Sequence, residues 1–353
     1  ILSRIIDLIK SIGGRISYLA LLLENPDALS HLIRLVEASP WIASFLAQHP
    51  VLLDELLDPR TLYIPPEAKQ IKVDLKHRMS QAPADDLEYQ IEQLCVFKEI
   101  NVLRVAAADV SGALPLMRVS DHLSDIAETV LGEVVKIAYN HLQEKHGAPA
   151  CLLDGVSCDR GFAVIAYGKL GGLELGYGSD LDLVFLHSGT QEKTQGGQQA
   201  IDSAQFFNRL GQRVIHILTS HTRAGRLYEI DMRLRPSGSS GPLVSHIDAF
   251  EKYQRDDAWT WEHQALIRSR AICGDPALRQ RYQQIRQAIL VQQRDPQQLR
   301  QDVLDMRRRL MEENVLPDKA IFDLKQGRGG IVDIEFLVQY LVLACSHDHP
   351  NLT

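Results

Sequence analysis

The sequence is poor in the features that mark secreted, membrane and zinc-ribbon proteins. Its five cysteines include no Cys-x-x-Cys pair, so neither a zinc ribbon nor a disulfide framework is predicted. The apolar run that begins at Leu21 is interrupted by Glu24, no apolar run reaches the length needed to span a membrane, and no signal-peptide pattern is present. We therefore expect a cytoplasmic protein with reduced thiols and no membrane partner.

Positive charge is also in short supply. The chain has 38 lysines and arginines against 45 acidic residues, which gives a formal net charge of -7. Nonspecific binding of nucleic acid requires a basic face, so we expect no nucleic-acid partner. The 353 residues are 45% hydrophobic, which is enough to bury a large core divided among two or three domains.

The start and the end of the sequence favour a piece of a longer chain. It begins with Ile1 rather than methionine, and Thr353 follows closely on an apolar helical pattern over residues 336–345. We expect a truncated fragment of a longer protein.

What the sequence does contain is a glycine-rich loop that leads into an acidic strand, over residues 167–185. Asp180 and Asp182 are two residues apart, and side chains alternate along a β-strand, so both carboxylates are predicted on one face. Two such ligands suit Mg²⁺, which leaves its other positions to water and substrate phosphates. The pattern predicts a phosphate-handling site that binds Mg²⁺, and Mn²⁺ would suit the same carboxylates.

A second acidic strand is predicted over Arg226–Pro236, where apolar and polar residues alternate. If this strand lay beside the first, Asp231 would complete a three-carboxylate cluster for two metal ions roughly 4 Å apart. Arg233 and Arg235 are predicted on the same face as Asp231. Because a guanidinium group matches phosphate oxygens in a bidentate manner, both arginines would contact the phosphates.

Each of these motifs has a plainer explanation when taken alone. An isolated Asp-x-Asp is more often a solvated strand edge or turn, and Arg233 and Arg235 alone would be expected in surface ion pairs. The combination favours function, because Asp180 and Asp182 stand at the mouth of an apolar run, where carboxylates are costly unless paired or metal-bound.

The spacing resembles that of the polymerase-beta-type nucleotidyltransferases in three places: Gly168-Lys169, then Asp180-Leu-Asp182 after ten further residues, and the later Asp231. That family usually carries Gly-Gly or Gly-Ser where this chain has Gly168-Lys169. Lys169, Ser179 or the amides of the loop that begins at Gly168 would therefore hold the phosphate oxygen here.

A longer set of motifs extends over nearly the whole chain: Gly168-Lys-Leu-Gly-Gly172, Glu174-Leu175, Ser179-Asp-Leu-Asp-Leu183, Asp231-x-Arg-Leu-Arg-Pro-Ser-Gly238, Trp259-Thr-Trp-Glu-His-Gln-Ala-Leu266 and Gly329-Gly-Ile-x-Asp-Ile-Glu-Phe336. Together they look like bacterial glutamine-synthetase adenylyltransferase. Members of that family have two similar catalytic halves, one attaching AMP to a tyrosine of glutamine synthetase and one removing it by phosphorolysis. This chain contains one half, and its stretches at 258–267, 234–238 and 50–58 resemble the C-terminal, adenylylating half more than the other.

The resemblance implies transfer of AMP from ATP to a tyrosine hydroxyl of glutamine synthetase, with release of pyrophosphate, in the control of nitrogen assimilation. It implies catalytic and metal-binding roles for Asp180, Asp182 and Asp231, and binding of ATP by Gly168, Lys169, Ser179, Arg233 and Arg235. It further implies control by glutamine and by the PII signalling protein, without indicating the residues involved. Three alternatives stay open: phosphorolytic de-adenylylation by the same carboxylates, a nucleic-acid nucleotidyltransferase, and a catalytically silent module that binds a helical partner.

We predict an α+β fold, in which a polymerase-beta-type nucleotidyltransferase domain is flanked by two helical regions. The apolar spacing is helical over residues 1–147 and again over 277–353, whereas residues 148–276 combine strands with one helix. Within this middle part, strands are predicted at 162–167 and 181–186 and a helix at 202–220.

Two features near the C-terminus are harder to interpret. The arginines Arg307–Arg309 are predicted on the solvated face of a long helix. Asp333, within the Gly329–Phe336 motif, is placed to cap the helix that follows, and the role of the motif as a whole is left open.

Overall fold

The computed structural model describes residues 2–14, 16–313 and 323–353. Contacts within the chain define two compact units, each assembled from three segments: residues 1–138, 173–180 and 213–230 in the first, and residues 139–172, 181–212 and 231–353 in the second. Within the described ranges, none of the helices is long and apolar enough to cross a membrane.

The first unit is built almost entirely from helices, as the spacing of apolar residues predicts. Its elements are α1 (Leu2–Ile12), α2 (Ile16–Glu24), α3 (Pro26–Ala38), α4 (Pro40–Gln48), the 3₁₀ helix η1 (Pro50–Leu57), α5 (Pro59–Leu62), α6 (Ala68–Ser80), α7 (Leu87–Val110) and most of α8 (Leu116–His146).

Local sequence signals start these helices. The hydroxyl of Ser39 accepts a hydrogen bond from the Ile42 amide at the start of α4, and Pro40 occupies the first helical position, where its missing N–H costs nothing. Asp86 caps α7 in the same way, accepting from the Tyr89 amide at 2.9 Å. The apolar faces of α1, α3, α4, η1 and α7 then bury one continuous core.

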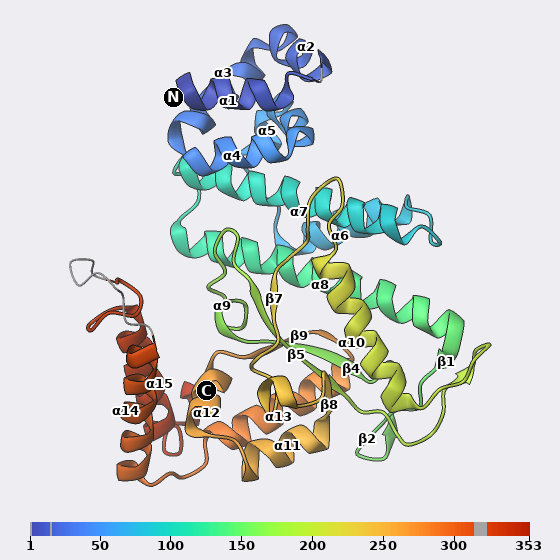
Figure 1. The fold of residues 1–353 in the computed structure, drawn as a ribbon, viewed down its shortest axis with the longest axis vertical. Helices are drawn as coiled ribbons and strands as arrows, with labels where there is room; N and C mark the ends of the chain where they lie inside the picture. The colour runs from blue at the N-terminus through green and yellow to red at the C-terminus, as the bar shows by residue number, and fades with distance from the viewer. Residues whose placement is uncertain (1, 15, 314–322) are drawn as a thin grey trace. The chain divides into compact units, whose positions relative to one another are not determined.

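The second unit contains the predicted α/β part and the C-terminal helices (Figure 1). Its elements are β1 (Gly147–Ala148), β2 (Leu152–Leu153), β3 (Val156–Ser157), β4 (Phe162–Ala166), α9 (Gly168–Gly171), β5 (Leu181–His187), β6 (Gln195–Gly196), α10 (Ser203–Thr219, whose last turns belong to the first unit), β7 (Ile230–Asp231), η2 (Gly238–Ser240), β8 (Val244–His246), α11 (Ile247–Asp256), α12 (Thr260–Ile267), β9 (Arg270–Gly274), α13 (Pro276–Leu290), α14 (Pro296–Glu313), α15 (Ile331–Cys345) and η3 (Pro350–Leu352).

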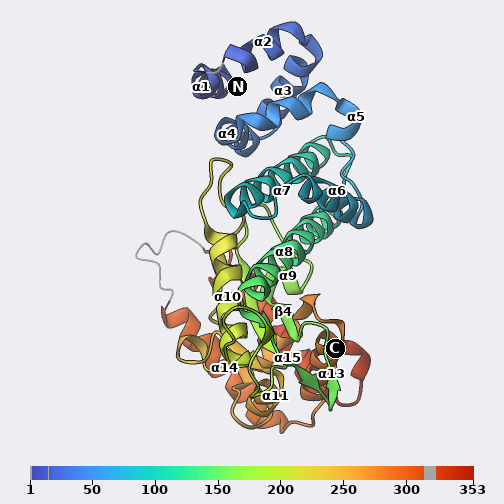
Figure 2. The same ribbon diagram turned by 90° about the vertical axis from the view of Figure 1, so that its right-hand side faces the viewer.

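Strand β5 is central to the main sheet, whose order is β7-β5-β4-β9 with β8 also paired to β5. The β4–β5 and β4–β9 pairs are antiparallel, and the β5–β8 pair is parallel. All five residues of β4 are buried, and Asp182 is the one residue of β5 that is not. Helices α11 and α13 pack against this sheet and share a core with it (Figure 2).

The predicted α+β fold class, with helices flanking the α/β part, is confirmed. The strands expected at 162–167 and 181–186 are β4 and β5, and the helix expected at 202–220 is α10, which begins and ends within one residue of the prediction. Strand β9 was not predicted. The secondary structure changes character near residues 147 and 276, but the domain boundaries placed there stay a prediction.

Candidate functional site

The first part of the predicted site lies where β4 ends and β5 begins. The Tyr167 amide donates to the Asp182 carbonyl at 2.9 Å, which carries the antiparallel ladder one residue beyond Ala166. Gly168 follows with φ +55°, and a Cβ atom on it would collide with Oδ2 of Asp182. The Asp182 carboxylate therefore lies directly against the Gly168 backbone, an approach that only glycine permits.

The glycine-rich loop begins as a single helical turn, α9, which is held in place by contacts with Arg268 and Arg270. The guanidinium group of Arg270 donates to the Leu170 carbonyl at 3.1 Å, and a Cβ atom on Gly171 would collide with the carbonyl oxygen of Arg268. These contacts hold the turn against the start of β9 and leave Lys169 exposed on it. Sequence reasoning missed Arg268 and Arg270, although arginines directly before the apolar run of β9 were a signal that could have been read.

Ser179 and Asp180 belong to the first unit, one step before β5 begins. The Ser179 hydroxyl accepts from the Gly176 amide at 3.2 Å and so closes a turn within the segment Leu173–Asp180. Asp180 is exposed. Because the unit boundary falls between Asp180 and Leu181, the shared face of Asp180 and Asp182 stays a prediction.

The second part of the predicted site departs from expectation. The strand predicted over Arg226–Pro236 is wrong, since only Ile230 and Asp231 are extended, as β7, beside β5. Oδ1 of Asp231 accepts from the Arg233 amide at 2.8 Å, a local side-chain bond that starts a turn in place of a strand ladder. The alternation that put Arg233 and Arg235 on one face with Asp231 is therefore absent.

Arg233 nevertheless contacts Asp231, through its side chain as well as its backbone. Its Nε donates to Oδ2 at 2.7 Å, and this hydrogen bond lowers the pKa of the Asp231 carboxyl. The Asp231 side chain is 16% exposed, whereas that of Arg233 is 85% exposed. An ion pair with one partner in water contributes little, so a ligand can displace Arg233 at small cost.

Arg235 instead holds the turn that follows β7. Its two terminal nitrogens donate to the carbonyl groups of Met232 at 2.8 Å and Ser239 at 3.2 Å. Its Nε is buried without a hydrogen-bond partner among the described residues. Arg235 therefore stabilises the Met232–Ser239 turn in this conformation, and its contact with phosphate stays a prediction.

The donor set fits a metal that arrives with a nucleotide. Among the residues described, no three His, Cys, Asp or Glu side chains are grouped so that they could hold a metal ion. Asp182 and Asp231, on the neighbouring strands β5 and β7, supply two carboxylates. Mg²⁺ typically takes one or two carboxylates and completes its shell with water and substrate phosphates, so two carboxylates would be enough. The three-carboxylate cluster with Asp180 stays a prediction.

The Gly329–Phe336 motif forms the start of α15 and makes two ion pairs. Asp333 accepts from the Gly329 amide at 2.6 Å and from Nε of Arg307 at 2.5 Å. The expected cap is wrong, because Gly329 precedes the N-cap residue Gly330, where α15 has no side-chain cap. The expected solvated face is wrong for Arg307, whose side chain is 8% exposed, because Asp333 pairs with it. Glu335 accepts from Arg268 at 2.7 Å.

Comparisons with known proteins agree with the motifs. The family model for glutamate-ammonia ligase adenylyltransferase matches residues 29–285. A bifunctional glutamine synthetase adenylyltransferase/adenylyl-removing enzyme of Thioalkalivibrio sulfidiphilus is 52% identical over 354 residues, covering 100% of this chain and 36% of the relative. The protein of the same name from Pseudomonas putida is 49% identical over 364 residues, covering 100% and 37%. The chain thus spans little more than a third of the length of these curated relatives. The match to the family model, over most of its length, shows that the chain belongs to the glutamate-ammonia ligase adenylyltransferase family.

Proposed function

We propose that this chain transfers AMP from ATP to a tyrosine hydroxyl of glutamine synthetase and releases pyrophosphate. The observation that carries the proposal is the fit between Gly168 and Asp182, in which a backbone without a side chain makes room for a carboxylate at the end of a buried strand. Family membership and the names of the relatives support glutamine synthetase as the acceptor.

The residues divide into metal ligands and phosphate ligands. Asp182 and Asp231, joined by Asp180, would hold Mg²⁺, or Mn²⁺ in its place. The amides of the turn at Gly168, together with Lys169 and Ser179, would bind phosphate oxygens of ATP, as backbone amides in tight turns do. Arg233 would exchange its exposed contact with Asp231 for a bidentate contact with phosphate, and Arg235 would join it only if its turn rearranges.

The chemistry needs no nucleophile from the chain. The tyrosine oxygen forms a bond to the α-phosphorus in line with the departing pyrophosphate oxygen, whose bond to phosphorus breaks. A bound divalent metal supplies charge neutralisation at the phosphoryl oxygens and the leaving group. Asp231 orients the attacking hydroxyl and accepts its proton as the bond to phosphorus forms, and the arginines balance charge that develops on pyrophosphate.

The proposal extends to the cellular setting that the resemblance implies. The protein acts in the cytoplasm on glutamine synthetase as its protein substrate, under control by glutamine and the PII signalling protein. No nucleic acid takes part, in keeping with the net charge of -7.

The test is to incubate the chain with ATP labelled in the α-phosphate, Mg²⁺ and unmodified glutamine synthetase. Label on the acceptor tyrosine, with stoichiometric pyrophosphate, is the expected result. Pre-adenylylated glutamine synthetase with phosphate is the parallel sample. Release of AMP-derived nucleotide there, with no label transfer in the first sample, would replace the proposal with phosphorolytic de-adenylylation.

A further inference from the structure

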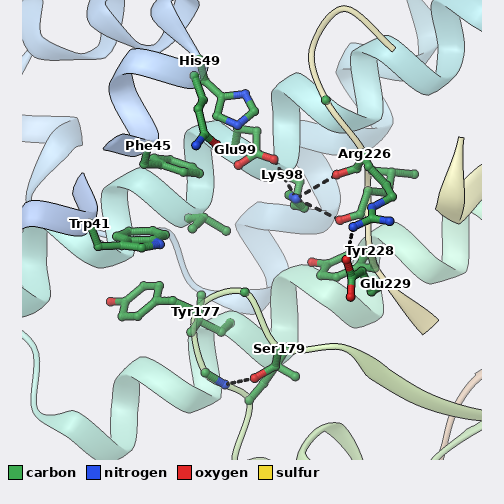
Figure 3. A pocket seen from close by; sticks show the side chains of 18 of the residues that line it. Trp41, Phe45, His49, Lys98, Glu99, Tyr177, Ser179, Arg226, Tyr228 and Glu229 are labelled. Atoms are coloured by element: carbon green, nitrogen blue, oxygen red, sulfur yellow. Dashed lines mark hydrogen bonds and ion pairs between the residues drawn. The ribbon is translucent and has the colours of Figure 1, made fainter. Parts of the chain in front are cut away.

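The two loops that carry proposed phosphate ligands are held in different ways. The loop before Asp180 closes on itself, because the Ser179 hydroxyl accepts from the Gly176 amide at 3.2 Å (Figure 3). The turn Gly168–Gly171 instead packs against a segment far along the chain, residues 266–270, where α12 ends and β9 begins. We call this segment the α12–β9 corner. Whatever fixes the corner therefore bears on the proposed phosphate site.

The corner and the turn meet backbone to backbone at Gly171. A Cβ atom on Gly171 would lie 2.3 Å from the carbonyl oxygen of Arg268 and 2.6 Å from that of Ala166. Beside this contact, the guanidinium group of Arg270 donates to the Leu170 carbonyl at 3.1 Å. A shift of the corner is therefore passed on to the turn, since Gly171 has no side chain that could absorb it.

Helix α13 holds the corner through a buried cation. Nε of Arg286 donates to the Leu266 carbonyl at 3.1 Å, and Nη2 donates to the Ile267 carbonyl at 2.6 Å. These are the last two carbonyl groups of α12, where a positive charge also meets the negative end of the helix dipole. The Arg286 fork thus fixes the direction in which the chain leaves the helix.

The burial of Arg286 indicates that its geometry matters. The residue is 8% exposed, burial lowers its pKa, and within the described residues no acidic side chain forms an ion pair with it. A cation buried without an acid is a costly way to fill space in a core. An apolar side chain could fill the same space, but it could not hold two carbonyl groups as the planar guanidinium group does.

A second side chain of α13 supports the same corner. Tyr282 lies one turn before Arg286 and donates from its hydroxyl to the Ser269 hydroxyl at 2.7 Å. The Ser269 hydroxyl in turn donates to the Leu266 carbonyl at 2.6 Å. One face of α13 therefore holds the corner through backbone and side-chain acceptors together.

Helix α15 holds the corner from its other side chain. Oε1 of Glu335 accepts from Nη1 of Arg268 at 2.7 Å. Gln264 donates to Gln339 at 3.2 Å, which adds a second contact between α12 and α15. The backbone on the near side of Arg268 is thus fixed by α13, and the Arg268 side chain is fixed by α15.

We propose that Arg286 and Glu335 are positioning residues, which act through the α12–β9 corner on the glycine-rich turn. The proposal gives a role to two stretches that the reaction itself leaves aside, residues 259–266, which form most of α12, and the Gly329–Phe336 motif, which begins α15. The effect on ATP rests on the proposed function, whereas the effect on the turn does not.

Hydrogen exchange on the 353-residue chain, without ATP or metal, measures the effect on the turn. The amides of Gly171 and Gly172 donate to carbonyl groups at the start of the turn at 3.1 Å and 2.9 Å. A looser corner exposes these amides more often, so we expect their exchange to be about tenfold faster in Arg286→Met and in Glu335→Gln. Exchange in α3 of the first unit is the internal reference and should stay constant.

Calorimetry with ATP and Mg²⁺, without acceptor, measures the effect on the proposed site. The dissociation constant of ATP should rise roughly tenfold in both variants, as when residues that support a metal site are removed. The KM for ATP should rise with it and kcat should change much less, because ground state and transition state lose the same contact. Arg286→Lys and Glu335→Asp keep the charge and should recover part of the loss.

Arg279→Met and Glu251→Gln are the matched controls. Arg279 lies on α13 as well and donates to the Ala271 carbonyl at 3.2 Å, beyond the corner. Glu251 accepts from Arg281 at 2.6 Å, in an ion pair between α11 and α13. Both variants should leave the exchange of the turn and the affinity for ATP unchanged.

The outcomes separate the proposal from its alternatives. Arg286→Met can fail to fold, but the Glu335 side chain is 39% exposed, so Glu335→Gln keeps the test decisive. Unchanged exchange of the turn in Glu335→Gln, even with a lower melting temperature, would make the residue merely structural and overturn the assignment, as would equal acceleration in the controls. Faster exchange with unchanged affinity for ATP would refute the effect on the site. Faster exchange in a chain whose wild type binds no ATP would refute only the proposed function.

Discussion

Asp182 and Asp231 lie on neighbouring strands of one sheet, yet the two are held in different ways. Asp182 belongs to a seven-residue strand whose other residues are buried, and its carboxylate fits against Gly168. Asp231 ends a two-residue strand, and its carboxylate is engaged by Arg233. One proposed metal ligand is thus placed by the core and the other by a local turn. The comparison teaches that the first half of the proposed site needs no rearrangement to receive substrate, whereas the second half would have to exchange a partner.

The largest expected effect comes from removing the preformed ligand. Asp182→Asn keeps the size of the side chain but withdraws a negative charge from the metal, so adenylyl transfer should fall by at least about 100-fold. The melting temperature should change little, because Asp182 is the least buried residue of β5. Transfer is followed with labelled ATP and folding by circular dichroism. A well-folded Asp182→Asn protein that retains activity contradicts the metal-ligand assignment.

Gly168→Ala tests whether the Gly168 backbone is what places Asp182. The new methyl group meets Oδ2 of Asp182 and also strains a residue with φ +55°. Left-handed strain costs roughly 1–2 kcal/mol, and the steric overlap adds about 1–3 kcal/mol.

The control is Gly155→Ala, in the β2–β3 hairpin, where φ is +80° and no atom lies within 4 Å of the added group. Strain alone should destabilise this variant by about 1–2 kcal/mol. Denaturant unfolding compares the two. Equal losses of unfolding free energy in Gly168→Ala and Gly155→Ala would show that the contact with Asp182 contributes nothing.

Asp275 stabilises the half of the proposed site that contains Asp182 and Gly168. It also makes the stability of the fold depend on pH. Burial by itself raises the pKa of this carboxyl, but hydrogen bonds from the amides of Arg160, Gly161, Leu278 and Ala277 outweigh burial and lower it. Asp275 thereby joins the entry to β4 to the start of α13. Asp275→Asn replaces an acceptor with a donor and should cost about 1–3 kcal/mol.

The depressed pKa means that the unfolded chain binds the proton more readily. The stability that Asp275 contributes is therefore complete above the unfolded pKa of about 4 and is lost as the pH falls through the lower folded value. Urea unfolding at pH 7 should separate the wild type from Asp275→Asn, and the gap should narrow in acid. A constant gap across this range would exclude the carboxylate as the cause.

The smallest effect on binding is expected at the half of the proposed site that contains Asp231 and Arg233. Arg233→Gln frees Asp231 from an exposed ion pair worth about 0.2–1 kcal/mol, so metal binding without nucleotide should tighten by roughly two- to fivefold. Mn²⁺ binding followed by electron paramagnetic resonance measures this change. Arg255→Gln, which breaks an exposed pair with Glu251, is the matched control and should leave the affinity for metal unchanged. Weaker metal binding in Arg233→Gln would mean that Arg233 supports the site in place of blocking it.

The contrast between strands placed by the core and a segment shaped by a local turn also explains which elements could be predicted from the sequence. Strands β4 and β5 are apolar on both faces and bounded by glycine-rich chain, and helix α10 carries a regular apolar stripe, so their positions followed from pattern alone. The Arg226–Pro236 segment alternates just as regularly. It fails as a strand because the Asp231 side chain competes for the Arg233 amide, a preference that alternation does not register.

Contacts between distant parts of the sequence could not be predicted from local sequence pattern. Arg307 belongs to a polar run in the sequence. It is nevertheless buried, because it forms an ion pair with Asp333, 26 residues later. Arg268 and Arg270 contact the glycine-rich turn, which lies about a hundred positions earlier in the sequence. Local pattern indicates which residues are apolar or charged, but a partner so far along the chain is found only once the fold brings the two together.

The fit between Gly168 and Asp182 also constrains how this chain can change over evolutionary time. A side chain at position 168 would displace the end of the Asp182 side chain and would strain a residue with φ +55°, so a single substitution at 168 moves the carboxylate from its present place. The residue at position 168 is therefore coupled to the position of the carboxylate at 182. A descendant that carries alanine at 168 is expected to hold this carboxylate elsewhere or to have lost it.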